Sequence, residues 1–217
     1  MTDLRELLGR SAVEVAPRLL GAVLHGRGVA VRLTEIEAYT GVGQDPGSHA
    51  HRGETPRTRT MFGEPGRLYA YFTYGMHTCV NVVAHPDGEA GAVLLRAGEV
   101  IAGVDAARER RTTSRSDSDL ARGPARLAVA LGLTLADDGM PLDGSDDVRL
   151  ILPGESGPDA PVAPPVDRIR SGPRTGVSGL GGGDAYPWRF WLDGDATVSP
   201  YRRHVPRSRG TVRPGGR

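Results

Sequence analysis

Residues 66–83 read GRLYAYFTYGMHTCVNVV, the pattern of two β-strands folded back on each other at a turn that contains glycine. A two-residue turn at Gly75-Met76 places the glycine where a hairpin needs a positive φ, and it pairs Tyr74 with His77. A turn at Tyr74-Gly75 instead would shift this register. Because side chains alternate along a strand, the first register predicts which side chains share a face. They are Tyr74, Phe72, Cys79 and Asn81, with Tyr69 and Tyr71 on the other face.

Two flanking runs carry polar residues where a buried strand is normally apolar. They read LTEIEAYTG at residues 33–41 and AVLLRA at residues 92–97. Glu37 ends the first strand-like run and Arg96 ends the second. Buried polar groups cost free energy unless they are satisfied, so their clustering indicates a functional site rather than a core. Taken alone, Arg96 would also suit a buried ion pair with Glu35 or Glu99.

The rest of the chain shows a mixed pattern of helices and strands. The sequence Ser11-Ala-Val-Glu14 predicts a capping box that opens a helix through about Leu20. Gly123-Pro124 predicts a second helix that ends near Gly132. Residues 40–66 show little periodicity, and we interpret them as a long functional loop. Strands are expected at residues 22–25, 29–38, 67–74, 77–84, 92–97, 148–152, 166–170 and 188–192.

The composition restricts the chemistry available to the chain. All 27 basic residues are arginine, so no lysine exists for a Schiff base or for a P-loop. The single cysteine, Cys79, excludes an internal disulfide and a cysteine-rich zinc site. No apolar run approaches the length of a bilayer span, and the N-terminus has no signal-peptide pattern. We therefore expect a cytoplasmic protein with no membrane partner.

The charge is unevenly distributed although the net charge is only +1. Residues 137–159 contain seven acids and one arginine, whereas residues 201–217 contain six arginines and no acid. Such asymmetry can offer one face to a polyanion; the alternative is a solvated acidic loop and a basic tail without a partner. We expect a single domain over residues 1–204 and a basic, flexible tail over residues 205–217.

Several spaced motifs resemble, in the same order, those of the 3-methyladenine (alkyladenine) DNA glycosylases. The likeness extends over roughly residues 8–200, and it depends on the conjunction of motifs because none of them is specific alone. A weaker likeness continues in RGP at residues 122–124 and RF at residues 189–190. The main motifs are EAY at 37–39, SHAHRGETPRTRTMF at 48–62, PGRLYAYFTYGM at 65–76, CVN at 79–81 and VLLRA at 93–97.

The resemblance implies an enzyme that flips an alkylated purine out of duplex DNA, hydrolyses its N-glycosidic bond and leaves an abasic site. Glu37 would activate the attacking water, and Arg96 would help to hold that water and the carboxylate. Asn81 would discourage guanine at the floor of the pocket. The implied base pocket consists of Tyr39, His49, Tyr71 and Asn81, and the implied intercalating residues are Tyr74 and Met76.

Pattern and resemblance together predict a single-domain α+β protein with a mostly antiparallel, curved β-sheet, surrounding helices and a protruding β-hairpin. We expect a monomer that binds double-stranded DNA containing damaged purines, in association with the nucleoid, and that uses neither a metal nor a cofactor. Because the chain has no lysine to attack the sugar, we infer a monofunctional enzyme that uses water and does not cut the strand.

Two other functions stay open at this level. His49-Ala-His51 has the appearance of a metal pair, which would suit a metal-dependent nuclease or phosphoesterase, although two ligands are fewer than a zinc site needs. A wedge at Tyr74 without any catalysis would suit a module that only distorts DNA. In the first case a chelator would abolish activity, and in the second case Glu37 would be dispensable.

Overall fold

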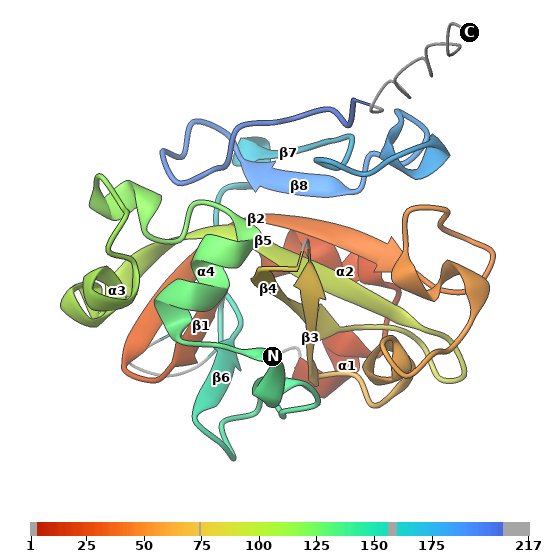
Figure 1. Ribbon diagram of the computed structural model, residues 1–217, viewed down its shortest axis with the longest axis horizontal. Helices are drawn as coiled ribbons and strands as arrows, with labels where there is room; N and C mark the ends of the chain where they lie inside the picture. The colour runs from red at the N-terminus through yellow and green to blue at the C-terminus, as the bar shows by residue number, and fades with distance from the viewer. Residues whose placement is uncertain (1–3, 74, 156–159, 206–217) are drawn as a thin grey trace, which may run out of the picture.

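One antiparallel sheet organises the fold. A computed structural model of the chain describes residues 4–73, 75–155 and 160–205. Within them, eight strands form a sheet in the order β3-β4-β5-β2-β1-β6, and β8 pairs with β2 and β7 (Figure 1). All pairings are antiparallel, so the predicted α+β class and sheet type are confirmed. The strands are β1 (Val23–Gly26), β2 (Val29–Thr40), β3 (Leu68–Thr73), β4 (His77–Val83), β5 (Gly91–Ala102), β6 (Val148–Ile151), β7 (Ile169–Gly172) and β8 (Arg189–Leu192).

The long strand β2 has two different neighbours along one edge. Its first residues pair with β1, whereas Glu35, Ile36 and Glu37 pair with β8. The pairing of β2 with β5 on the other edge shifts in register between Leu33 and Ile36. Irregularities of this kind bend a strand and increase its twist. Glu37 therefore lies inside a strand, at the bend, and not at a strand end as the sequence suggested.

The described part of the chain contains four α-helices: α1 (Leu4–Leu8), α2 (Ala12–Leu19), α3 (Val104–Arg110) and α4 (Pro124–Leu131). The predicted helices correspond to α2 and α4, and α4 ends at Gly132 with a left-handed φ of 71°. Ser11 precedes α2 but makes no side-chain hydrogen bond to it, so the predicted capping box is wrong. The short helices α1 and α3 were not predicted, because neither is long enough to show a clear apolar periodicity.

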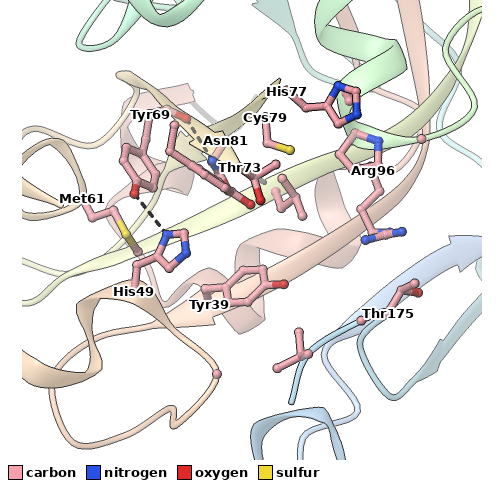
Figure 2. Close-up of a pocket in the computed structure, with 18 of the residues that line it drawn as sticks. Tyr39, His49, Met61, Tyr69, Thr73, His77, Cys79, Asn81, Arg96 and Thr175 are labelled. Carbon is pink, nitrogen blue, oxygen red and sulfur yellow. Dashed lines mark hydrogen bonds between the residues drawn. The ribbon is translucent and has the colours of Figure 1, made fainter. Parts of the chain in front are cut away.

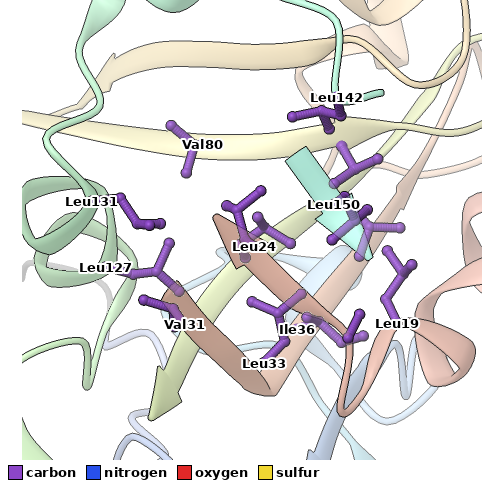
Figure 3. Close-up of a cluster of buried hydrophobic side chains, with 14 of the residues drawn as sticks. Leu19, Leu24, Val31, Leu33, Ile36, Val80, Leu127, Leu131, Leu142 and Leu150 are labelled. Atoms are coloured by element: carbon purple, nitrogen blue, oxygen red, sulfur yellow. The ribbon is translucent and has the colours of Figure 1, made fainter. Parts of the chain in front are cut away.

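Apolar side chains cover one face of the sheet and form the main core (Figure 3). From β2, the residues that enter this core are Val31, Leu33, Ile36 and Ala38. From the helices, Leu19 of α2 and Leu127 and Leu131 of α4 pack against them. Neighbouring strands contribute alternate residues, namely Leu68, Ala70, Val80, Val82, Val93 and Leu95. Because residues alternate between faces, the intervening residues point to the opposite side, where the polar side chains gather.

The hairpin of β3 and β4 has a different register from the predicted one. Thr73 pairs with His77, so the three residues 74–76 connect the strands instead of two. Gly75 has a φ of 69°, and the backbone N–H of Met76 donates to the carbonyl of Thr73. The glycine therefore has the expected left-handed conformation, but inside a longer loop of a kind that is also common in hairpins.

This register changes which side chains share a face. Tyr69 pairs with Asn81, Tyr71 pairs with Cys79, and these four side chains lie on one face. The prediction that Phe72 shares a face with Cys79 and Asn81 is wrong, because a shift of one position moves a side chain to the opposite face. Tyr74 lies outside the described residues.

Two further predictions concern the later part of the chain, and a third concerns membrane spans. Val166–Arg168 forms a 3-10 turn, and β7 begins only at Ile169, so the strand predicted at residues 166–170 is displaced. The tail predicted at residues 205–217 lies outside the described residues, apart from Val205. Among the helices that the structure describes, none combines the length and the apolar character that crossing a membrane requires.

Candidate active site

A cavity of about 490 Å³ lies on the polar face of the sheet (Figure 2). Residues of β2, β3, β4 and β5 line it, together with the first residues of α4 and with residues 175–178. This volume is in the range of sites that enclose a small organic ligand. The sheet and the loop that follows β2 bring together five of the predicted site residues on the lining: Tyr39, His49, Tyr71, Asn81 and Arg96.

Aromatic rings form one wall of the cavity. The ring of His49 meets the ring of Tyr71 edge to face, with 4.7 Å between centroids, and Tyr71 lies 5.6 Å from Tyr69. The Nδ1 atom of His49 lies 3.2 Å from the hydroxyl oxygen of Tyr69. A 3-10 turn over His49–Arg52 presents the histidine, and Ser48 caps this turn by accepting the backbone N–H of Ala50. This part of the loop is thus held by its own cap, and it places His49 on the cavity lining.

This aromatic wall is uncharged at neutral pH. Burial of its ring, together with the charge of Arg57, lowers the pKa of His49 to about 4. Burial raises the pKa of Tyr69 to about 12 and also raises the pKa of Tyr71. Burial and then the charge of Glu37 raise the pKa of Tyr39. A flat ligand would therefore contact neutral ring faces, and a cationic ligand would meet no repulsion from His49.

Glu37 lies directly behind the cavity wall. Its side chain is fully buried, and three donors hold the carboxylate. The Tyr39 hydroxyl donates to Oε2 at 2.8 Å, the backbone N–H of Thr175 donates to Oε1 at 2.6 Å, and Arg96 Nη1 lies 3.3 Å from Oε2. All three partners line the cavity, whereas Glu37 does not. The carboxylate is therefore fixed in orientation and separated from the cavity only by its own partners.

Arg96 joins Glu37 to a buried network of charges. Its Nε donates to Glu35 Oε1 at 2.9 Å, and Arg189 Nε donates to the same oxygen at 2.7 Å. Burial opposes the charge of Arg96, but Glu37 and Glu35 outweigh it and raise the pKa of Arg96. Arg96 therefore pairs with both Glu35 and Glu37, while Glu99 pairs with Arg32. The two negative charges of Glu35 and Glu37 are balanced by the two positive charges of Arg96 and Arg189, and this pairing permits the burial of all four groups.

Asn81 lies on β4 next to the aromatic wall. Its side-chain Nδ2 donates to the backbone carbonyl of Tyr69 at 2.9 Å, across the hairpin. The amide is buried and lines the cavity beside Cys79. This hydrogen bond restricts how the amide can rotate, so that the cavity presents a polar group with a defined orientation.

The tip of the hairpin projects from the rim of the cavity. Met76 is 67% exposed and does not line the cavity, while Thr73 and His77 line it. Phe72, on the opposite face of the hairpin, is 46% exposed. The position of these two exposed apolar side chains on the hairpin beside the cavity makes the tip a candidate contact surface.

Sequence reasoning missed the segment PRTGVSG at residues 173–179. Thr175 holds Glu37, and Arg174 is fully buried in an ion pair with Asp45. The segment has the Gly and Pro content of an ordinary loop, so its only signal was an arginine and a threonine among turn residues. Neither residue type indicates burial, because arginine is normally exposed.

His49 and His51 were considered as a metal pair. Throughout the residues that the structure describes, no group of three or more histidine, cysteine, aspartate or glutamate side chains is arranged to hold a metal ion. The Nδ1 atom of His51 is buried and has no hydrogen-bond partner among the described residues, whereas His49 contacts Tyr69 and Tyr71. Nothing in this arrangement favours metal-dependent chemistry over the aromatic pocket.

Comparison with known proteins gives the chain a family. The model of a family described as methylpurine-DNA glycosylase matches residues 6–196, which is most of the chain. The chain belongs to the methylpurine-DNA glycosylase family. Similar proteins occur in Leifsonia xyli (55% identical over 214 residues, 95% of each chain), Streptomyces avermitilis (52% over 216 residues, 95% of each) and Mycobacterium tuberculosis (45% over 203 residues, 91% of this chain and 93% of the relative). Each of these relatives carries the provisional name 3-methyladenine DNA glycosylase.

Membership of the methylpurine-DNA glycosylase family makes the chain a DNA repair enzyme that hydrolyses N-glycosyl bonds. The resemblance that the spaced motifs indicated is confirmed. DNA is accordingly its substrate class. The roles of the individual residues around the cavity stay predictions, and their geometry supports specific proposals.

Proposed function

We propose that the chain removes alkylated purines of the 3-methyladenine type from duplex DNA. The damaged nucleotide would be flipped into the cavity, and a water activated by Glu37 would hydrolyse the N-glycosidic bond to leave an abasic site. One observation carries this proposal: a fully buried carboxylate is held by three residues that line a pocket with one wall of uncharged aromatic rings.

The carboxylate of Glu37 has acceptor capacity left for a water. A carboxylate offers about four acceptor positions, about two on each oxygen. Among the described residues, Oε2 accepts from Tyr39 and Arg96, whereas Oε1 accepts from Thr175 alone. A water on the free position of Oε1 would lose a proton to the carboxylate as its oxygen bonds to the sugar carbon, while the base departs with the electron pair of the glycosidic bond. The negative charge also stabilises the positive charge that grows on the sugar.

The pocket suits a flat, cationic purine. Tyr39, Tyr71 and His49 present neutral rings, and aromatic faces stack on bases and attract cations. An alkylated purine that carries a positive charge is also a good leaving group, so little acid catalysis is needed. Asn81 would act against guanine, whose exocyclic amino group would clash with this buried amide or lack a partner.

The hairpin tip would act on the duplex. Insertion of Tyr74 and Met76 between base pairs would fill the space that the flipped nucleotide leaves. The exposure of Met76 supports this role. We propose that a monomer carries out the reaction and, because the chain has no lysine to form an imine with the sugar, that the product strand stays intact.

Base release from a defined lesion tests this function. The purified chain is incubated with a duplex that contains 3-methyladenine, with and without a chelator, and the free base and the intact strand are quantified. We expect release of free base, no effect of chelator, and strand breaks only after alkali. Strand breaks that precede alkali and that the chelator abolishes would support a metal-dependent nuclease instead. A covalent adduct trapped by borohydride would contradict hydrolysis by water, unless it formed on the Met1 amine.

A further inference from the structure

The most deeply buried cation of the described residues outside the Arg96 network is Arg174, which precedes Thr175. Its guanidinium forms two hydrogen bonds of 2.6 Å with the two oxygens of Asp45, and both side chains are fully inaccessible. It also donates to the carbonyl oxygens of Ala38 and Gly181. These contacts use all five N–H donors of an arginine. Such complete pairing is what a buried charge requires.

This ion pair connects three segments that surround the site. Asp45 belongs to the loop that leads to His49, and it also accepts the backbone N–H groups of Thr40 and Gly47. Ala38 belongs to β2, between Glu37 and Tyr39. Gly181 belongs to the segment that follows Thr175. One guanidinium therefore holds the loop, the strand and the C-terminal segment together.

Two neighbours of Arg174, namely Thr175 and Tyr39, donate hydrogen bonds to Glu37. The backbone N–H of Thr175 donates to Oε1 of the carboxylate, at 2.6 Å. The guanidinium stacks on the ring of Tyr39, with 4.5 Å from its central carbon to the ring centroid, and the hydroxyl of Tyr39 donates to Oε2. Two of the three groups that orient Glu37 are thus fixed in place by Arg174.

Glycines permit this close arrangement. A side-chain carbon at Gly47 would lie 2.6 Å from Arg174 Nη2 and 2.7 Å from a methyl carbon of Val177. A side-chain carbon at Gly181 would collide with the backbone of Gly47, and one at Gly182 with the carbonyl of Val177. Gly181 and Gly182 therefore have a physical reason, because their backbone packs closely against Gly47 and Val177 beside the Arg174–Asp45 pair.

We propose that Arg174 is a positioning residue for base release, which holds Glu37 in its reactive orientation through the backbone of Thr175 and the ring of Tyr39. This inference rests on the proposed role of Glu37. It differs from a purely structural role, because a structural ion pair would change the amount of folded protein without changing the reaction of the folded protein. The positioning role requires the rate constant of the folded enzyme to fall.

The contacts of Arg174 with Asp45, Ala38, Gly181 and the ring of Tyr39 are called the clamp below. Two variants disturb this clamp in different ways. Arg174→Lys keeps the charge but offers three donors and no planar group, so it cannot reproduce the five hydrogen bonds and the stacking. Gly47→Ala keeps Arg174 and displaces its guanidinium. Arg27→Lys is the matched control for the first, because Arg27 pairs with Asp137 and does not line the cavity. Gly9→Ala is the control for the second, since its added carbon would approach no atom closer than 3.4 Å.

The readout separates the reaction from folding and binding. Base release is followed in single turnover with enzyme in excess over a lesion duplex, the dissociation constant of that duplex is measured, and rates are corrected for the folded fraction from circular dichroism. We expect both clamp variants to lose roughly 10- to 100-fold in rate constant, as misplacement by about 1 Å can cause, with duplex affinity little changed. Both controls should stay within about twofold of the original chain in rate constant.

Rates for Arg174→Lys and Gly47→Ala within about twofold of the original chain would overturn the proposal. If Arg174→Lys does not fold, the result for Gly47→Ala decides. Failure of the proposed function is a separate outcome. It would show as no base release by the original chain, or as base release by Glu37→Gln at the original rate.

Discussion

At the scale of single residues, His49 links the pocket to the pH dependence of stability. The pKa of His49 is lowered to about 4 in the folded chain, first by burial and then by the charge of Arg57, from an ordinary value of 6.5. Between these two values the unfolded chain binds a proton that the folded chain does not. The free energy of unfolding should therefore fall as the pH decreases from about 6.5 towards 4.

Replacement of His49 by glutamine tests this linkage. His49→Gln removes the titrating group, so the melting temperature of the variant should decrease less than that of the original chain over the same pH interval. The difference in melting temperature should be moderate, because part of His49 stays in contact with solvent and water screens its charge. His77→Gln, at an exposed histidine on the rim, is the control. Parallel pH profiles for His49→Gln and the original chain would contradict the lowered pKa.

Apart from what the family resemblance implies, residues could be placed in the site from the sequence only where a polar side chain interrupted an apolar run. Glu37, Asn81 and Arg96 interrupt strands in this way, and all three lie at or directly behind the cavity. Arg174 and Asp45 gave no such signal, because each lies in a Gly- and Pro-containing loop. Their burial depends on contacts between segments more than 100 residues apart, which are invisible in local sequence.

At the scale of elements, the hairpin of β3 and β4 shows how an error of one residue in the length of a turn changes which side chains share a face. The strands and the glycine turn were predicted within one or two residues. A loop of three residues instead of two then exchanged the faces of the hairpin, which placed Tyr69 and Tyr71 on the cavity face with Asn81. The true register groups the aromatic wall on one side, and it leaves Met76 at the tip.

The tip of this hairpin should contribute to binding of the duplex. Met76→Ser should weaken the affinity for a lesion duplex by roughly 5- to 30-fold, because an exposed apolar side chain that enters the base stack loses its contacts, worth about 1 to 2 kcal/mol. The dissociation constant is measured by fluorescence anisotropy. Val162→Ser is the matched control, since Val162 is 89% exposed and does not line the cavity. Equal losses in the two variants would show that the tip has no special contact with DNA.

At the scale of the whole molecule, the sheet and the helices that cover it were predictable, but the pairing of strands from distant parts of the sequence was not. Pattern and resemblance together predicted the mostly antiparallel sheet, and local signals at Ser11 and at Gly123-Pro124 predicted the helices α2 and α4, which pack on its core face. The pairing of β8 with the bent middle of β2 was not apparent, because it depends on a register shift. The pairing of β8 with β2 brings Arg189 beside Glu35 and completes the buried charge network.

The arginine-rich end of the chain should add affinity for DNA that does not depend on sequence. Deletion of residues 206–217, which lie outside the described residues, removes four arginines. Each lost phosphate contact should reduce the slope of log K against log salt concentration by about 0.9. The slope is measured with an undamaged duplex, so that base recognition does not contribute. An unchanged slope would show that these arginines do not contact the phosphates.

The central claim is that Glu37 activates water for hydrolysis of the glycosidic bond, and one measurement tests it most directly. Glu37→Gln keeps the size of the side chain and removes the negative charge. Its single amide oxygen can still accept the backbone N–H of Thr175, while its NH2 group takes the place of the oxygen that accepts from Tyr39 and Arg96. Base release in single turnover is compared with the affinity for the same 3-methyladenine duplex. We predict that the variant binds the lesion duplex within a few-fold of the original chain and loses roughly 100- to 10,000-fold in the rate of base release, the usual contribution of a general base. Base release at the original rate would contradict the account.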